Sequence, residues 1–246
     1  MKLILLGTNG YHPNDRRQTA CMMLPEVGVL LDAGTAIYRA SEYLQTESLD
    51  IFLTHTHLDH VFGLTFLYDM LYAHQANEVT VHALPEKLAA IGEHLFAEPL
   101  FPVKPPFKTK ALKETTVLRD GAKLTHFPLE HPGGSIGYRI DWSDRSMAYV
   151  TDTTARLDAP YVSKIAGVDV LLHECQLRDG DEEFARITGH SCTTPVAQVA
   201  AHAKVGRLIL VHLSPTSTDD DPIDLDVARA IFPATEIGED RMQIEF

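Results

Sequence analysis

Four side chains that can bind a divalent metal lie within one short segment of the chain, residues 55–60. They are His55, His57, Asp59 and His60. The apolar, β-branched segment 49–54 before them predicts a buried strand, and the apolar spacing within 61–73 predicts a helix. In an extended segment the first two histidines point to one side, whereas the later ligands follow the turn. Because the two pairs of side chains point at neighbouring positions, this spacing predicts two metals close together. Imidazole and carboxylate ligands suit Zn, Mn or Fe.

A histidine-rich surface loop that binds nothing is the alternative interpretation of this segment. The position of the segment disfavours that alternative, because the strand fixes the first two side chains and the helix start fixes the last two. We therefore expect a metal site on this strand-to-helix loop.

The bulk composition limits the class of protein. The chain of 246 residues, 45% of them hydrophobic, suits one domain or a tightly joined pair with a large core. No apolar run reaches about 18 residues, so we expect no membrane span, and Met1–Gly7 predicts a first strand rather than a signal peptide. Three cysteines, an odd number, favour a reducing cytoplasm. The formal net charge of −13 disfavours general nucleic-acid binding, because Lys and Arg must neutralise phosphates.

Strand and helix signals alternate along the chain and predict an α/β fold. The expected strands are 2–7, 19–24, 27–32, 49–54, 79–83, 115–118, 123–129, 135–141, 146–151, 168–173, 208–211 and 242–246. The expected helices are 35–44, 61–73, 85–97, 160–166, 193–204 and 224–231.

The segment Pro99–Phe107 contains four prolines and cannot form a regular element. We interpret it as a loop over the metal site, or as the joint at which a single domain of residues 1–246 divides into two halves. Lys108, Lys110 and Lys113 follow it and form the only locally basic patch.

Three further candidate ligands each end or directly follow an apolar strand: His131, Asp152 and His212. Together with residues 55–60 they resemble the motifs of the metallo-β-lactamase superfamily, and the chain as a whole is similar to its ribonuclease Z-like branch. This resemblance implies a four-layer αββα sandwich of two mixed β-sheets flanked by helices, with the metals at one sheet edge.

The resemblance also implies a ligand set. It assigns one metal to His55, His57 and His131, and the second metal to Asp59, His60 and His212. Asp152 would bridge the two ions. Zn is the expected metal, with Mn and Fe as alternatives.

Two more motifs carry the resemblance to the ribonuclease Z-like branch. Leu172–Cys175 is similar to its His-Glu-Ala-Thr loop, and Gly189–Thr193 is similar to its Gly-His-Ser-Thr motif. By this resemblance, Glu174 orients His190, and His190 stabilises the transition state or acts as general acid. The alternative gives both residues ordinary structural roles at a strand end and a helix start.

The resemblance implies a hydrolase in which a metal-bound hydroxide, oriented by Asp59, attacks an ester without a covalent intermediate. A phosphodiester is the expected substrate. Ribonuclease Z proper carries a tRNA-binding arm between the positions of His131 and Asp152, whereas here only residues 132–151 separate them. Together with the acidic charge, this disfavours tRNA 3′ processing and other nucleic-acid substrates, and favours a small phosphodiester.

Other functions remain open on the same scaffold. Metal-bound hydroxide also attacks sulfate esters and lactones, so an aryl- or alkylsulfatase or a lactonase is an alternative. The fold does not decide between these functions. A non-catalytic metal-binding protein is a further alternative, which the complete ligand set disfavours. The sequence leaves a homodimer open as well.

Arg16 and Arg17 lie in a turn-rich loop and could hold a phosphate or sulfate group, or could simply be solvated. The remaining histidines are expected to have ordinary structural or surface roles, although His12 lies in a loop that could approach the site. They are His12, His74, His82, His94, His126, His173 and His202.

Overall fold

The structure, a computed structural model, describes residues 1–73, 76–217 and 219–246. It contains two compact units, each built on its own sheet. Unit 1 comprises Met1–Lys113 and Glu239–Glu245, and unit 2 comprises Glu114–Gly238 and Phe246. Within the described ranges, no helix has both the length and the apolar character needed to cross a membrane.

Unit 1 is built on a mixed seven-stranded sheet with the strand order β14-β1-β2-β3-β4-β5-β6. The strands are β1 (Lys2–Gly7), β2 (Cys21–Leu24), β3 (Val29–Leu31), β4 (Ser48–Phe52), β5 (Glu78–Ala83), β6 (Lys108–Ala111) and β14 (Met242–Glu245). Neighbours from β14 to β3 pair antiparallel, whereas those from β3 to β6 pair parallel.

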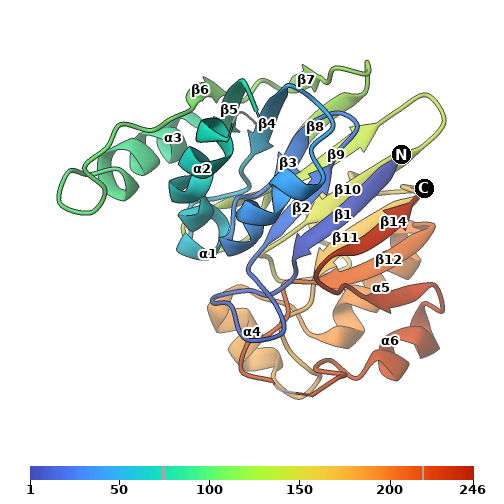
Figure 1. Ribbon diagram of the computed structural model, residues 1–246. Coiled ribbons are helices and arrows are strands. Elements are labelled where there is room, and N and C mark those ends of the chain that lie inside the picture. The colour runs from blue at the N-terminus through green and yellow to red at the C-terminus, as the bar shows by residue number, and fades with distance from the viewer. Residues whose placement is uncertain (74–75, 218) are drawn as a thin grey trace. The chain divides into compact units, whose positions relative to one another are not determined.

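Parallel strands need crossover connections, and these supply the helices of unit 1. The helices are η1 (Thr35–Glu42), α1 (Leu58–Val61), η2 (Phe62–Phe66), α2 (Leu67–Tyr72), α3 (Pro85–Ala90) and η3 (Ile91–Leu95). They lie on one face of the sheet (Figure 1), where apolar side chains of strands and helices form one buried cluster that includes Ile51 and Leu64.

Unit 2 repeats this plan with the strand order β13-β12-β11-β10-β9-β8-β7. The strands are β7 (Thr115–Val117), β8 (Lys123–Leu129), β9 (Ser135–Asp141), β10 (Ser146–Val150), β11 (Val170–Glu174), β12 (Arg207–Val211) and β13 (Thr235–Ile237). Neighbours from β7 to β10 pair antiparallel, and those from β10 to β13 pair parallel.

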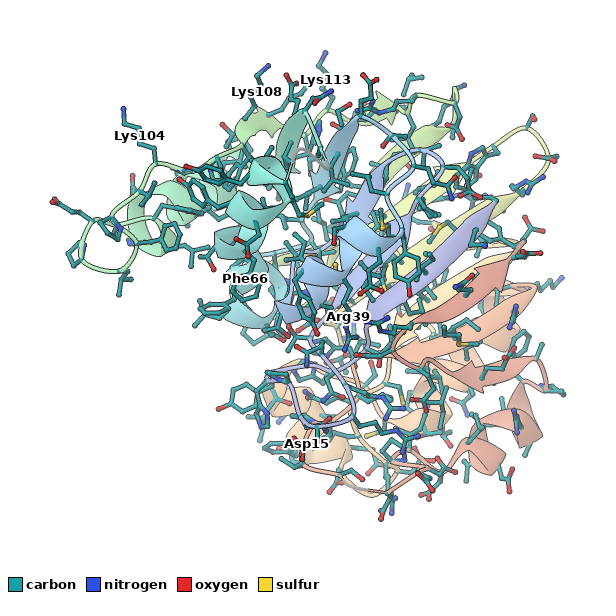
Figure 2. The ribbon with its side chains drawn as sticks, in the orientation of Figure 1. Asp15, Arg39, Phe66, Lys104, Lys108 and Lys113 are labelled. Atoms are coloured by element: carbon teal, nitrogen blue, oxygen red, sulfur yellow. The ribbon has the colours of Figure 1, made fainter. Side chains whose placement is uncertain are left out.

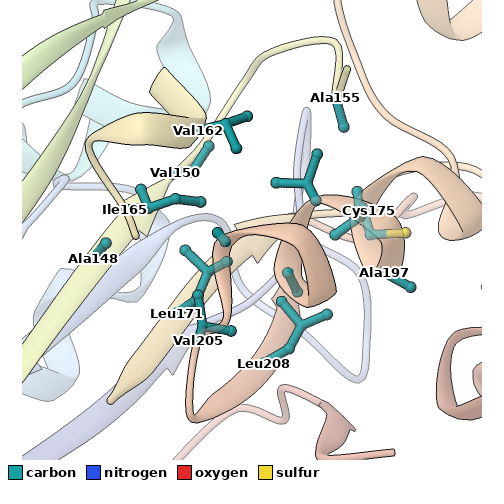
Figure 3. Packing of buried hydrophobic residues seen from close by; sticks show 14 of the residues in the cluster. Ala148, Val150, Ala155, Val162, Ile165, Leu171, Cys175, Ala197, Val205 and Leu208 are labelled. Carbon is teal, nitrogen blue, oxygen red and sulfur yellow. The ribbon is translucent and has the colours of Figure 1, made fainter. Parts of the chain in front are cut away.

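The helices of unit 2 are η4 (Pro160–Ser163), α4 (Glu182–Thr188), α5 (Thr193–Ala203) and α6 (Leu225–Ile231). Figure 3 shows the buried cluster of this unit where α5 lies over the strands, with Ala197 on the helix and Leu171 and Leu208 on β11 and β12. This packing covers the parallel strands β10 to β12, and Asp152 and His212 follow β10 and β12.

Several expected elements differ from those in the structure. The helix expected at 61–73 is broken into α1, η2 and α2, and it begins at Leu58. Gly63 lies within η2, where a Cβ atom would be 2.2 Å from the Gly34 carbonyl oxygen, so this turn packs too closely for a larger residue.

Three elements were not expected from the sequence. Strand β6, helix α4 and strand β13 are short and bury few apolar side chains, so they lack the apolar periodicity that marks the others. Strand β6 carries Lys108 and Lys110 at an edge of the sheet, where lysines prevent pairing with another chain. Figure 2 shows Lys104, Lys108 and Lys113 extending away from the ribbon.

Candidate metal centre

The four candidate ligands of unit 1 lie together where β4 ends and α1 begins. The ring centroids of His55 and His57 are 4.6 Å apart, and those of His55 and His60 are 4.2 Å apart. His60 Nε2 lies 3.4 Å from Asp59 Oδ2. One short segment therefore brings three imidazoles and one carboxylate close together.

A buried carboxylate, Asp32, orients two of these histidines. Its Oδ2 accepts a hydrogen bond from His60 Nδ1 at 2.8 Å, so the Nε2 of that ring carries the lone pair and faces Asp59. The backbone N–H and the hydroxyl of Thr54 donate to the same carboxylate, and the Thr54 hydroxyl lies 3.0 Å from His55 Nδ1. Asp32 adopts a left-handed φ of 61°, a strained conformation of the kind that gathers at functional sites.

The loop between β1 and β2 holds Asp59 from outside the segment. The backbone N–H of Tyr11 donates to Asp59 Oδ2 at 2.7 Å. The loop is in turn fixed by Asp240, whose carboxylate accepts hydrogen bonds from the backbone N–H groups of Thr8 and Gln18. Both arginines of this loop, Arg16 and Arg17, donate to Glu239 Oε1. In the structure both arginines are therefore paired with the Glu239 carboxylate.

In unit 2, Asp152 lies between two histidines. Its Oδ2 is 3.6 Å from His131 Nε2, and its Oδ1 is 3.3 Å from His212 Nε2. The three residues follow β8, β10 and β12, and His212 adopts a left-handed φ of 57°. Each oxygen of Asp152 thus faces a different imidazole.

These separations fit shared metal ions. Two ligands at about 2.1 Å from a tetrahedral Zn ion lie about 3.4 Å from each other. The distances from Asp59 to His60 and from Asp152 to His131 and His212 run from 3.3 to 3.6 Å. They match that spacing and exceed the usual hydrogen-bond length. The donor sets of imidazole and carboxylate in both units therefore fit Zn or a similar ion.

The orientation of His131 depends on a glycine. His131 Nδ1 donates a hydrogen bond to the Gly189 carbonyl oxygen at 2.9 Å. The lone pair of its Nε2 is therefore left to bind a metal. Gly189 has a φ of 77°, and a Cβ atom there would lie 2.7 Å from His131 Nδ1 and 2.5 Å from Pro132 Cδ. Only glycine allows this approach.

Glu174 and His190 lie in the same cluster of unit 2. Glu174 is fully buried, and its carboxylate accepts hydrogen bonds from the backbone N–H groups of Thr153 and Gln176. Its Oε1 lies 3.4 Å from His190 Nδ1. The His190 ring centroid is 5.2 Å from that of His131 and 5.4 Å from that of His212.

His190 also belongs to a group of side chains that could hold a metal ion. One donor atom from each of Asp152, His190 and His212 lies within 4.8 Å of the others, so the structure allows a ligand role that the sequence does not assign. The two roles, ligand and proton donor, predict different effects when the side chain is removed.

A second buried histidine supports the Glu174 backbone. His173 Nδ1 donates to the Glu174 carbonyl oxygen at 2.7 Å, so its Nε2 accepts from the Tyr161 hydroxyl at 2.9 Å. Burial lowers the pKa of His173 and raises the pKa of Tyr161, because neither charged form is solvated there. His173 thus has the structural role expected for it, and it supports the backbone of Glu174.

The remaining expectations concern residues outside the clusters. His82 is buried on β5 against Asp50, and His94 and His202 are exposed. His74 lies outside the described residues. All three cysteines are buried thiols, and burial raises the pKa of Cys192 to about 12.

Sequence reasoning missed Asp32, Tyr11 and Tyr161. Asp32 offered a signal, because it ends an apolar strand and precedes a glycine-containing turn. The contribution of Tyr11 is a backbone N–H and that of Tyr161 is a contact between distant segments, so neither left a pattern in the sequence.

Known proteins resemble this chain over its full length. The model of the β-lactamase superfamily domain matches residues 28–213. Ribonuclease BN of Citrobacter koseri is 28% identical over 304 aligned positions that cover 98% of both chains. Ribonuclease Z of Metallosphaera sedula is also 28% identical, over 98% of this chain and 97% of its own.

Solved structures show the same fold. The metallo-β-lactamase fold protein YhfI from Bacillus subtilis has a TM-score of 0.80 at 18% identity and covers 99% of both chains. A diphosphatase from the PhnP family has a TM-score of 0.75 at 18% identity, over 100% of this chain and 96% of its own. These matches confirm the fold class expected from the sequence. The family model, the full-length relatives and the His/Asp clusters together establish that the chain belongs to the metallo-β-lactamase superfamily of metal-binding hydrolases and is related to ribonucleases Z and BN.

Proposed function

We propose that this protein is a dinuclear metal-dependent hydrolase that cleaves small phosphodiesters. The observation that carries the proposal is the position of Asp152, whose two oxygens face His131 and His212 at the spacing of metal ligands. The two clusters would together hold two divalent ions, Zn first among the candidates. His55, His57 and His131 would bind one ion, Asp59, His60 and His212 the other, and Asp152 both.

When bound, the two ions would activate a water molecule for attack and neutralise charge on the phosphoryl group. The chain's own residues would position the reactants. Asp59, held by the Tyr11 N–H, would accept a hydrogen bond from the attacking water and fix its direction. His190, held beside the buried Glu174, would donate a proton to the leaving oxygen.

The connections within unit 2 support a small substrate. Strands β9 and β10 and a short turn occupy the segment between His131 and Asp152, in agreement with the expectation from the sequence. The alignment with ribonuclease BN runs over 304 positions, more than the 246 residues of this chain, so that relative has residues without a counterpart here. The net charge of −13 adds repulsion toward RNA.

A panel of substrates tests the proposal. The protein loaded with Zn or Mn is assayed with bis-p-nitrophenyl phosphate, p-nitrophenyl sulfate, a lactone and a precursor tRNA. We expect the phosphodiester to have the largest kcat/KM. Faster turnover of the sulfate or the lactone would replace the proposal with a sulfatase or lactonase, and correct 3′ cleavage of the precursor tRNA at physiological salt would replace it with tRNA processing. Metal binding without turnover of any substrate would favour a non-catalytic protein.

The bridging role has its own test, which does not depend on activity. Asp152→Ala should lose metal at both positions, because both ions share that carboxylate. Elemental analysis after dialysis reports the number of metals for each chain. Retention of two tightly bound ions by the variant would remove the bridge from the proposal.

A further inference from the structure

An apolar cavity of about 250 Å³ lies in unit 1 directly beside the metal-binding segment. Thr56, Leu58 and Val61 form one wall, and they alternate with the candidate ligands in the sequence. The rest of the lining comes from Ala90 on α3, from Ile91, His94 and Leu95 on η3, and from Leu100 of the loop after η3. A group bound there would lie next to the ligand segment.

Two large apolar side chains of this cavity are exposed to solvent. Leu58 is 66% exposed and Leu100 is 73% exposed. An exposed apolar side chain does not gain the free energy that burial would provide. Apolar side chains gathered around a cavity therefore often mark a binding site.

The loop that carries Leu100 is held in place. The ring of Phe96 lies edge-on to the rings of Phe101 and Phe107, with centroids 5.2 and 5.5 Å apart. The Tyr68 hydroxyl donates to the Lys104 carbonyl oxygen. These contacts partly bury Phe101 and Phe107, whereas Leu100 lines the cavity.

The lining determines what kind of group fits. Apart from the Thr56 hydroxyl and the imidazole of His94, the described residues around the cavity are apolar. A charged group would lose its hydration there without a partner. A dry cavity of about 150 Å³ holds benzene, so this larger cavity suits a bicyclic aromatic or a similar hydrocarbon group.

We propose that this cavity binds the hydrocarbon group of an aryl or alkyl ester whose phosphoryl group lies at the neighbouring metal centre. The inference rests on the proposed function and narrows its substrate class to phosphodiesters with a large apolar substituent. The cavity therefore selects the substrate, whereas the metal ligands select the bond that breaks.

Two pairs of matched variants test this cavity. Ala90→Phe fills the cavity, whereas Ala89→Phe adds the same ring to an exposed neighbour on α3 that is not part of the lining. Leu100→Ser removes an apolar wall, whereas Val103→Ser makes a similar change at an exposed position of the same loop, outside the lining. Because Leu100 is largely exposed, its replacement leaves the fold intact even if Ala90→Phe does not fold.

The first measurement is binding of 1-naphthol, which has no phosphoryl group, followed by its fluorescence. We expect saturable binding to the wild type and to both controls, and at least about 10-fold weaker binding to Ala90→Phe and Leu100→Ser, the lower end of what a lost apolar contact costs. Equal binding to all five proteins, or no binding to the wild type, overturns the inference.

The second measurement compares methyl and 1-naphthyl p-nitrophenyl phosphate. We expect the wild type and controls to prefer the naphthyl ester by at least about 10-fold in kcat/KM, and the cavity variants to lose that preference while keeping activity on the methyl ester. Equal kcat/KM for both esters in the wild type overturns the inference and leaves the proposed function standing. Naphthol binding without hydrolysis of either ester overturns the proposed function and, with it, the assignment of the cavity to a substrate.

Discussion

Asp32 and His60 form a fully buried carboxylate–imidazole pair, with Asp32 Oδ2 2.8 Å from His60 Nδ1. The pair joins the end of β3 to the first turn of α1. Because a carboxylate can only accept here, it fixes the tautomer of His60 and directs the Nε2 lone pair toward Asp59. A partner of this kind is expected to raise metal affinity without touching the metal.

Asp32→Asn should therefore lower zinc affinity by about 10–100-fold, because the amide neither enforces the tautomer nor adds negative charge. Competition with a chelator of known affinity measures the change. Asp50→Asn is the matched control, since Asp50 lies 2.8 Å from His82 Nε2 in the same unit but supports no candidate ligand. Equal loss of affinity in both variants would mean that Asp32 acts through stability alone.

The sequence offers a signal for the candidate ligands, because they lie at or shortly after the ends of apolar strands. Parallel strands of one sheet bring their carboxyl ends to one edge, which applies to Asp152 and His212 after β10 and β12. His55 follows β4 in the other sheet, and its signal is the family motif. The direction of this pairing, parallel from β10 to β12, is a finding of the structure.

The partners of the ligands could not be predicted in the same way. Asp32 precedes His60 by 28 positions, and Gly189 follows His131 by 58. Such contacts depend on how separate strands and loops pack, and a strand-end carboxylate or a glycine after a helix is too common to signal them. The short elements β6 and α4 could not be predicted for a related reason, because they bury little apolar surface.

Gly189→Ala should reduce metal occupancy and turnover together. The positive φ of Gly189 strains any larger residue, and the added Cβ atom would lie only 2.7 Å from His131 Nδ1, which forces His131 away from its present position. Gly180→Ala is the matched control, because Gly180 has a φ of 104° with nothing within 4 Å of its Cβ position. Thermal unfolding should show a loss of about 1 kcal/mol for both variants from backbone strain, whereas only Gly189→Ala should lose zinc. Full zinc occupancy in that variant would contradict the role given to Gly189.

His173 should make the protein less stable in acid. Burial lowers the pKa of this histidine below its usual value of 6.5, so the folded state resists a proton that the unfolded state accepts. The free energy of unfolding should therefore fall as the pH drops below about 6.5, the usual histidine value, and continue to fall until the lowered folded-state pKa is passed.

Urea unfolding of wild type and His173→Gln at pH values from 8 to 5 measures how much His173 contributes to the pH dependence of the free energy of unfolding. Because all other titrating groups are shared, the difference between the two curves isolates His173. The wild type should lose more stability than the variant across this range. Parallel curves would show that His173 takes up its proton equally in both states.

The last prediction separates the two roles that the structure allows for His190. If it donates a proton to the leaving oxygen, His190→Ala should lower kcat by about 10²–10⁴-fold while metal content stays the same. The loss should be larger with a poor leaving group than with p-nitrophenolate, since only the poor one needs the proton. If His190 is instead a ligand beside Asp152 and His212, the variant should lose metal, and the rate should fall equally on both substrates.

Glu174→Gln completes the test, because Glu174 lies 3.4 Å from His190 Nδ1 and would act only through it. Its loss of kcat should be smaller than that of His190→Ala, and the double variant should fall close to His190→Ala alone, since residues that act as one unit are not additive. A double variant in which the two losses multiply would mean that Glu174 works independently of His190, for example by holding the Thr153 backbone beside Asp152. Full activity of His190→Ala on both substrates would leave only the metal ligands of the superfamily in the mechanism, and would return the sulfatase and lactonase alternatives to equal standing with the phosphodiesterase.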